Sequence, residues 1–88
     1  MQAFETKKTV TIYTTPDCQF CRELRDFLNE RQISYIEHNV IDQPDRLSEM
    51  QRLTGGSASV PVIVTNRMQP DQNVFIGFDS TSLERALS

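Results

Sequence analysis

Cys18 and Cys21 are the only cysteines of this chain of 88 residues, and Gln19 and Phe20 separate them. Two intervening residues let a thiol pair close a small disulfide that can be reduced again. The thiolate form of a cysteine attacks disulfides, so a reactive cysteine needs its negative charge stabilised. The spacing therefore predicts thiol–disulfide exchange, with Cys18 as the nucleophile and Cys21 as the resolving thiol.

The pair stands where a strand pattern gives way to a helix pattern. Residues 9–14 alternate between apolar and polar types, as in a half-buried strand, and residues 24–28 carry leucine and phenylalanine at helical spacing. The first turn of a helix offers free N–H groups and the positive end of the helix dipole. We expect Cys18 to receive that stabilisation, and Cys21, three residues later, to lie on the same helix face.

Length and composition indicate one globular domain over residues 1–88, with a polar lead-in at 1–7. The chain is 38% apolar and 24% charged, and its net charge of −3 gives no electrostatic reason to expect nucleic acid as a partner. It has no apolar run long enough to span a bilayer, and its first residues lack the apolar core of a signal peptide. We therefore expect a cytoplasmic protein. In that reducing compartment, a close cysteine pair is more typical of catalysis than of structure.

The rest of the pattern predicts an α/β fold with the order β-α-β-α-β-β-α. Strands are expected at about 8–14, 34–40, 60–64 and 73–76. Helices are expected at about 18–31, from Pro44 to the Gly55-Gly56 step, and after a cap at Asp79 or Ser80. The first two strands should be parallel, because a helix connects them, and the last two should form an antiparallel hairpin.

This order, with a thiol pair opening the first helix, resembles the thioredoxin fold in its smallest, glutaredoxin-type form, a four-stranded mixed sheet flanked by helices. The resemblance covers about residues 8–87 and implies a dithiol–disulfide oxidoreductase. Three motifs carry it: Thr15-Pro16-Asp17-Cys18-Gln19-Phe20-Cys21, Ser59-Val60-Pro61 and Gly77-Phe78-Asp79.

The resemblance also implies a substrate groove beside the thiols. Family members have a cis bond before the proline of the second motif, and a backbone strand there pairs with the peptide or glutathione that carries the disulfide. The third motif would form the rim of the groove, where a helix start can receive a carboxylate of glutathione. The expected substrate-binding residues are Thr15, Gln19, Phe20, Ser59, Val60, Pro61, Gly77, Phe78 and Asp79.

The chain departs from the usual glutaredoxin pattern at three places. Gln19 and Phe20 stand where many members have Pro-Tyr, Thr15 stands where typical members have lysine, and Gly77-Phe78 replaces paired glycines. The last two changes weaken the expectation of a glutathione site. The Gly-Phe step is similar to that of the NrdH-type redoxins, which take electrons from thioredoxin reductase, and the start of the chain is similar to that of the mycoredoxins. The subgroup and the electron donor stay open.

Two side chains have a structural interpretation beside the functional one. Phe20 has helical spacing to Leu24 and Phe27, which is typical of a core residue, whereas the family exposes this position beside the groove. Asp79 suits a helix cap as well as a groove rim, and the two roles are compatible.

For partners, we expect disulfide-containing proteins as substrates and glutathione or thioredoxin reductase as the electron source. We expect a monomer that binds no membrane, no nucleic acid, no metal and no tightly held cofactor. A structural zinc site needs about four cysteine or histidine ligands, and the chain has only the two cysteines and His38. Two alternatives remain: a redox-sensing regulator of the Spx or arsenate-reductase type, which shares the Thr-x-Pro-x-Cys-x-x-Cys run, and a glutathione-dependent iron–sulfur carrier.

Overall fold

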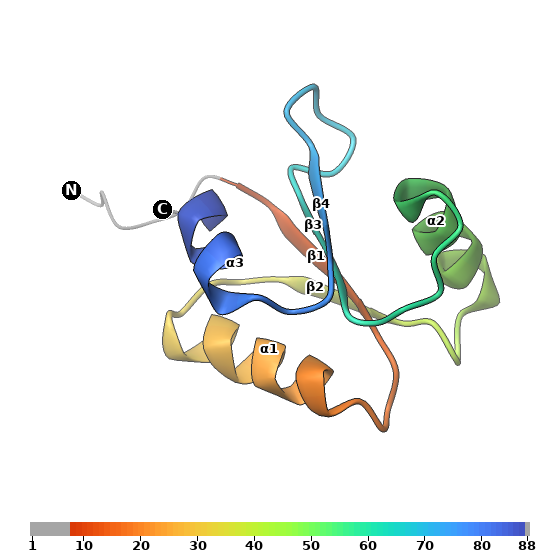
Figure 1. Cartoon of the computed structure of the whole chain (residues 1–88), viewed down its shortest axis with the longest axis horizontal. Coiled ribbons are helices and arrows are strands. Elements are labelled where there is room, and N and C mark those ends of the chain that lie inside the picture. The colour runs from red at the N-terminus through yellow and green to blue at the C-terminus, as the bar shows by residue number, and fades with distance from the viewer. Residues whose placement is uncertain (1–7, 88) are drawn as a thin grey trace.

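The computed structural model describes residues 8–87, so the expected lead-in at 1–7 lies outside the described residues. The elements are β1 (Val10–Thr14), α1 (Gln19–Glu30), β2 (Ile36–Asn39), α2 (Pro44–Thr54), β3 (Val62–Thr65), β4 (Asn73–Ile76) and α3 (Ser80–Leu87) (Figure 1). The order β-α-β-α-β-β-α is the one that the sequence predicts.

The four strands form one mixed sheet in the order β2-β1-β3-β4. Strand β1 is parallel to β2 and antiparallel to β3, and β3 is antiparallel to β4. The parallel first pair and the antiparallel last pair are confirmed. Because β1 and β3 are the two central strands, the strand that leads to the thiols is hydrogen-bonded on both sides.

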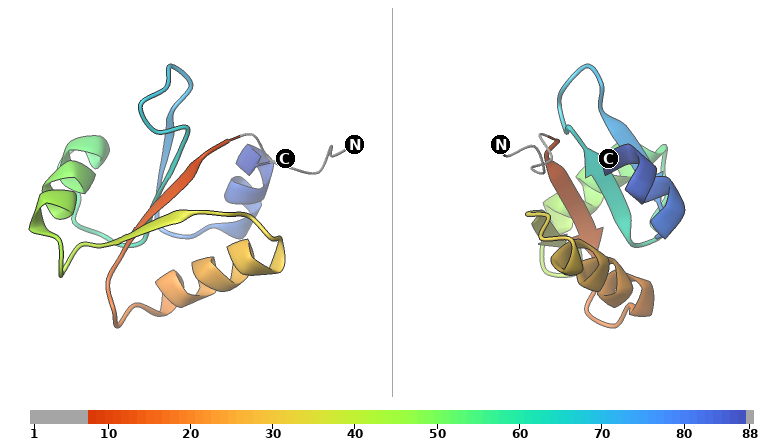
Figure 2. Two further views of the ribbon diagram at one scale, coloured as in Figure 1. Left: turned by 180° about the vertical axis from the view of Figure 1, so that it is seen from behind. Right: turned by 90° about the vertical axis from the view of Figure 1, so that its left-hand side faces the viewer.

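Alternating side chains divide the apolar core between the two faces of the sheet. On β1, Val10 and Ile12 pack with α1 and α3, whereas Tyr13 packs with α2. On β3, Ile63 joins the first cluster, and Val62 joins the second. This is the period of two expected for strands covered on both faces. Figures 1 and 2 show α2 apart from α1 and α3, in agreement with two separate clusters.

Strand β4 has the predicted bounds, whereas the other three strands are shorter than expected and β3 is displaced along the chain. It runs from Val62 to Thr65 instead of over 60–64. Pro61 has no N–H to donate to the sheet, so regular pairing begins only after it. Strand β1 begins at Val10 and β2 covers only 36–39, while α1 begins one residue after Cys18.

Helix α2 is tied to the sheet by a polar cluster. The buried Tyr13 hydroxyl donates a hydrogen bond to the Glu49 carboxylate. The same carboxylate makes ion pairs of 2.8 Å with Arg46 of α2 and with Arg67 of the β3–β4 connection. Burial and the hydrogen bond to Glu49 raise the pKa of Tyr13 to about 12, so the phenol stays a neutral donor.

The Glu49 carboxylate gives the fold a pH dependence that can be measured. Burial opposes its ionisation, but the hydrogen bonds from Tyr13 and Arg46 and the nearby arginine charges hold its pKa below the ordinary 4.5. The unfolded chain therefore binds more protons near pH 4.5, so this stabilisation is complete above that pH and is lost as the pH falls through the lower folded pKa.

We expect Glu49→Gln to lower the free energy of unfolding at pH 7 by about 1 kcal/mol, since a neutral amide keeps only part of the hydrogen bonding. The deficit should shrink as the pH falls below 4, where the parent carboxyl is also neutral. Urea unfolding of both proteins between pH 7 and pH 3 measures it. A deficit that does not change with pH would contradict this assignment.

Candidate active site

Cys18 and Cys21 lie at the start of α1 as a disulfide, with their Cα atoms 5.1 Å apart. Cys18 is the N-cap residue of the helix, and its Sγ accepts a hydrogen bond of 3.1 Å from the Cys21 N–H. Cys18 is partly exposed, whereas Cys21 is fully buried. An accessible sulfur that already receives a helix N–H suits the attacking thiolate, and a buried sulfur one turn later suits the resolving thiol.

The register of the sheet brings all three sequence motifs to one end. Tyr13 pairs with Val62, so Pro61 lies opposite Thr14, the last residue of β1 before the chain turns toward the thiols. Val62 pairs with Ile76, and the Gly77 N–H donates a hydrogen bond of 2.8 Å to the Pro61 carbonyl. The connections before α1, before β3 and after β4 therefore lie at the same end of the sheet, the lower end in Figure 1.

The second motif has the backbone expected of it. The Val60–Pro61 peptide bond is cis, as predicted. Pro61 is buried, Val60 is half-buried against the α2 side of the core, and Ser59 is exposed. Within residues 8–87, no hydrogen bond uses the backbone N–H or carbonyl of Val60. An extended peptide can pair with these two groups, which is the strand-addition mode of binding.

The third motif turns the chain from β4 into α3. Gly77 has φ of +85°, a left-handed conformation that favours glycine. Phe78 is half-buried, with its ring 5.5 Å from that of Phe27 on α1. The phenylalanine that replaces the second glycine of the usual pattern thus packs against α1.

Asp79 caps α3, as the sequence predicts. Its carboxylate accepts hydrogen bonds from the Thr81 N–H at 3.2 Å and from the Ser82 hydroxyl at 2.9 Å. The Ser82 hydrogen bond is the main cause that lowers the pKa of this carboxyl. The start of α3 therefore already holds a negative charge supplied by the chain itself, and an incoming carboxylate would be repelled there.

The remaining expected site residues lie around the thiols. Phe20 is 58% exposed, so its side chain is outside the core, as the family pattern implies and contrary to the core interpretation of its spacing. Gln19 is exposed and donates a hydrogen bond of 3.2 Å to Glu23 one turn along α1. Thr15 is partly exposed in the turn before the helix. The binding roles of these three residues stay predictions.

Two exposed apolar side chains at the same end were not anticipated. Ile76 is 54% exposed at the end of β4, next to Gly77. Ile41 is 64% exposed just after β2, where the Val40 N–H binds the Thr14 carbonyl at the end of β1. Nothing in the local sequence distinguishes them from core residues, because only the fold shows which apolar side chains lack a neighbour. Ile76 pairs with Val62 of the α2-side cluster, so it lies on the face of the sheet opposite to α1.

The described part of the chain offers no ready site for a metal ion. Among residues 8–87, no group of three or more histidine, cysteine, aspartate or glutamate side chains could hold one. A cluster bound to Cys18 and Cys21 would therefore need ligands from another source. None of the helices in the same range has the length and apolar character needed to cross a membrane.

The glutaredoxin family model matches residues 10–68, which span the thiol pair and the cis-proline. The chain belongs to the glutaredoxin family. An uncharacterized glutaredoxin-like 8.6 kDa protein in the rubredoxin operon of Clostridium pasteurianum is 30% identical over 78 residues, covering 89% of this chain and 96% of that protein. The global transcriptional regulator Spx of Listeria monocytogenes is 33% identical over 79 residues, but this glutaredoxin-family chain covers only 59% of its length.

Solved structures place the fold in the thioredoxin superfamily. The chain is similar to the glutaredoxin-like protein NrdH-redoxin from Escherichia coli, with 26% identity, a TM-score of 0.69, and coverage of 88% of this chain and 92% of the other. A thioredoxin-like protein of known crystal structure matches with 26% identity and a TM-score of 0.77, covering 90% of this chain and all of that one. The family and the thiol pair together support a thiol–disulfide redox function for this chain.

Proposed function

We propose that this chain is a cytoplasmic oxidoreductase that reduces disulfides of proteins, or their mixed disulfides with glutathione, through Cys18. The observation that carries the proposal is the asymmetry of the pair. Cys18 is accessible, caps α1 and receives the Cys21 N–H, whereas Cys21 is fully buried behind it. The unpaired backbone of Val60 supports a substrate strand beside these thiols.

The proposed reaction is two successive exchanges. The Cys18 thiolate attacks one sulfur of the substrate disulfide, forms a mixed disulfide with it, and releases the other substrate sulfur as a thiolate. Cys21, once deprotonated, then attacks the Cys18 Sγ, which closes the Cys18–Cys21 disulfide and releases the second substrate thiolate. Two electrons pass from the chain to the substrate. A thiol-based donor must return them by the reverse exchange.

The surroundings of the pair favour a protein donor over glutathione. Thr15 stands at the position where typical glutaredoxins have a lysine, so this chain lacks that positive charge for a carboxylate of glutathione. The negative charge of Asp79 already lies at the start of α3. The similar NrdH-redoxin is described for its thioredoxin-like activity profile. We expect NADPH with thioredoxin reductase to reduce the oxidised chain faster than NADPH with glutathione and glutathione reductase, as followed by NADPH absorbance. Faster reduction by the glutathione system would overturn this choice of donor.

The asymmetry of the pair predicts different reactivities of the two thiols. In the reduced protein, we expect iodoacetamide at pH 7 to modify Cys18 at least about 10-fold faster than Cys21, because only the thiolate reacts and only Cys18 is accessible. Mass spectrometry of the digested protein locates the label. In Cys21→Ser, the pH profile of alkylation should give Cys18 a pKa below the ordinary 8.5. Faster labelling of Cys21 would reverse the roles.

The Spx relatives support a second candidate, a redox-sensing regulator. The chain spans about three-fifths of the Spx regulators, so their regulatory function is not carried over with the likeness. This candidate predicts that the oxidised and reduced forms differ in binding to a protein of the transcription machinery. Copurification of the chain with RNA polymerase in only one redox state would favour it over the oxidoreductase.

A further inference from the structure

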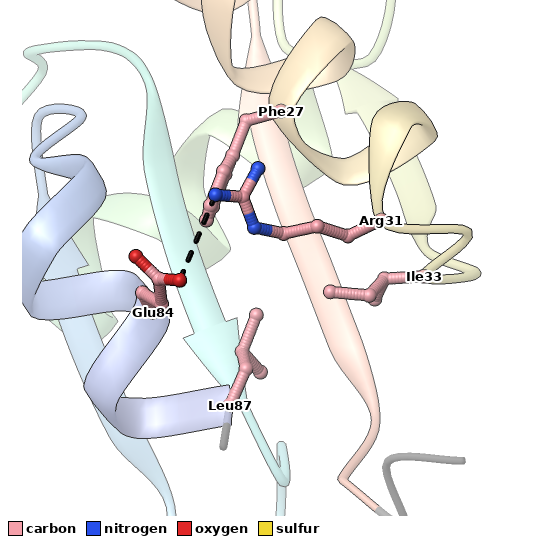
Figure 3. A pocket seen from close by; sticks show the side chains of 5 residues that line it. All are labelled: Phe27, Arg31, Ile33, Glu84 and Leu87. Atoms are coloured by element: carbon pink, nitrogen blue, oxygen red, sulfur yellow. Dashed lines mark ion pairs between the residues drawn. The ribbon is translucent and has the colours of Figure 1, made fainter. Parts of the chain in front are cut away.

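A groove runs between α1 and α3, away from the thiol pair. Its first part is a hollow of about 290 Å³ with Phe27 of α1 and Phe78 among its lining residues. Its second part is a hollow of about 190 Å³ lined chiefly by Phe27, Ile33 and Leu87 (Figure 3). Because the two hollows share Phe27 and Arg31, they form one continuous surface. We call it the α1–α3 groove.

A cation of the chain itself crosses the middle of this groove. The Arg31 guanidinium lies 3.8 Å from the centre of the Phe27 ring, and its Nη2 is 3.7 Å from a Glu84 carboxylate oxygen across the groove (Figure 3). Both charged side chains are well exposed. The chain's own cation therefore covers the Phe27 ring and bridges the two helices in the second hollow.

The side of the groove nearer the thiols is acidic. Glu23, Asp26 and Glu30 line the first hollow. Within residues 8–87, none of the three carboxylates makes an ion pair, and Glu23 accepts only the Gln19 amide. The apolar floor and the acidic rim are complementary to a segment that carries both an apolar and a basic side chain.

The groove and the thiol site are formed by neighbouring residues of the same segments of the chain. Phe78 follows Gly77, which binds the Pro61 carbonyl, and Glu23 is two residues after Cys21. With a rise of about 1.5 Å per helical residue, Asp26 lies about 12 Å along α1 from Cys18, and Glu30 about 18 Å. An extended chain covers about 3.3 Å per residue. A substrate segment that starts at the attacked cysteine therefore reaches these carboxylates after about four to six residues.

We propose that the α1–α3 groove docks protein substrates that carry a lysine or arginine about four to six residues from the attacked cysteine, with an apolar side chain between them. The inference rests on the proposed reaction at Cys18 and names its substrate class. The apolar side chain packs on the half-buried Phe78, and the basic one meets Asp26 and Glu30. Free glutathione is too short and too acidic to use this surface.

The test follows the reduced chain as it attacks peptides whose single cysteine is joined to 2-nitro-5-thiobenzoate, since the released thiol absorbs in the visible. In one peptide the lysine is five residues after the cysteine, and in a second peptide it is five residues before it. In both, a leucine lies between the cysteine and the lysine. Each peptide has a counterpart with glutamine in place of lysine. At low salt we expect one lysine peptide to react about 3- to 10-fold faster than its counterpart, and 0.5 M NaCl to remove the preference.

The variants Asp26→Asn/Glu30→Gln and Asp45→Asn/Asp71→Asn each remove two negative charges, but only the first pair lies in the groove. We expect the lysine preference to disappear in the groove variant and to persist in the control. An equal loss of the lysine preference in both variants would show that the preference depends on net charge alone, and it would overturn the proposal. Sedimentation could also show that the parent chain self-associates and that only the groove variant abolishes this. That result would overturn the proposal, because a second copy of the chain would then occupy the groove.

A separate measurement keeps this proposal distinct from the proposed function. Bis(2-hydroxyethyl) disulfide is small and uncharged, so its reduction by the parent chain depends on the thiols alone. Reduction of this disulfide without any lysine preference would overturn docking in the groove and leave the oxidoreductase intact. Failure to reduce it would overturn the oxidoreductase itself.

Discussion

Replacement of Cys18 by serine is expected to lower protein-disulfide reduction to the background rate. The accessible sulfur is lost, and the Cys21 sulfur that remains is fully buried. A serine hydroxyl stays protonated at neutral pH and cannot form a mixed disulfide, so the first exchange has no nucleophile. Turnover of a protein disulfide with an excess of reductant measures the loss, and circular dichroism checks that the variant is folded.

Cys21→Ser is the matched control, because it removes the other sulfur of the same pair. This variant should complete the first exchange and then stop, since nothing is left to attack the Cys18 Sγ. Mass spectrometry should detect a mixed disulfide between the chain and its substrate at Cys18. Full turnover by Cys18→Ser, or trapping of substrate on Cys21 in that variant, would refute the assigned roles.

Leu24→Ala is expected to cost about 2–5 kcal/mol of stability, the usual range for a buried leucine. Leu24 is fully buried in the cluster that joins α1 to the sheet and to α3. Small domains are stable by only about 5–15 kcal/mol, so the loss is a large fraction of the total. Urea unfolding monitored by circular dichroism measures it. Because α1 carries both thiols, redox activity should fail at a lower urea concentration as well.

Two variants separate this effect from general damage to α1. Leu24→Met nearly conserves the volume and should cost less than about 1.5 kcal/mol. Asn29→Ala changes an exposed position of the same helix and should stay within about 0.5 kcal/mol of the parent. If Leu24→Ala cost no more than these two, the cluster on this face of the sheet would not be the main support of α1.

Much of the fold follows from patterns that are local in the sequence. Helix α2 begins at Pro44 and ends before Gly55, whose φ of +74° favours glycine. The order of elements and the sense of the strand pairs follow from the spacing of such signals. The ends of β3 do not follow, because a strand begins where both neighbours can pair with it, and Pro61 removes one donor at that point.

The candidate site was predicted unevenly, for a similar reason. The thiol pair, the cis bond before Pro61 and the cap at Asp79 depend on short segments, so motifs reveal them. The exposure of Ile41 and Ile76 depends on what the folded chain leaves uncovered. An apolar residue at a regular spacing is taken as core until the fold shows otherwise.

The sequence by itself determined the chemistry of this protein. Two cysteines three residues apart at a helix start predict a disulfide that can be reduced again, and only a few neighbouring residues are needed to form it. The tertiary structure alone decided what surrounds that chemistry. Glu23 and Phe78 are 55 positions apart in the chain, yet they line one hollow because α1 and α3 pack on the same face of the sheet. The residue pattern of a single helix or strand cannot predict such a contact, because the contact depends on how two separate helices pack against a shared core.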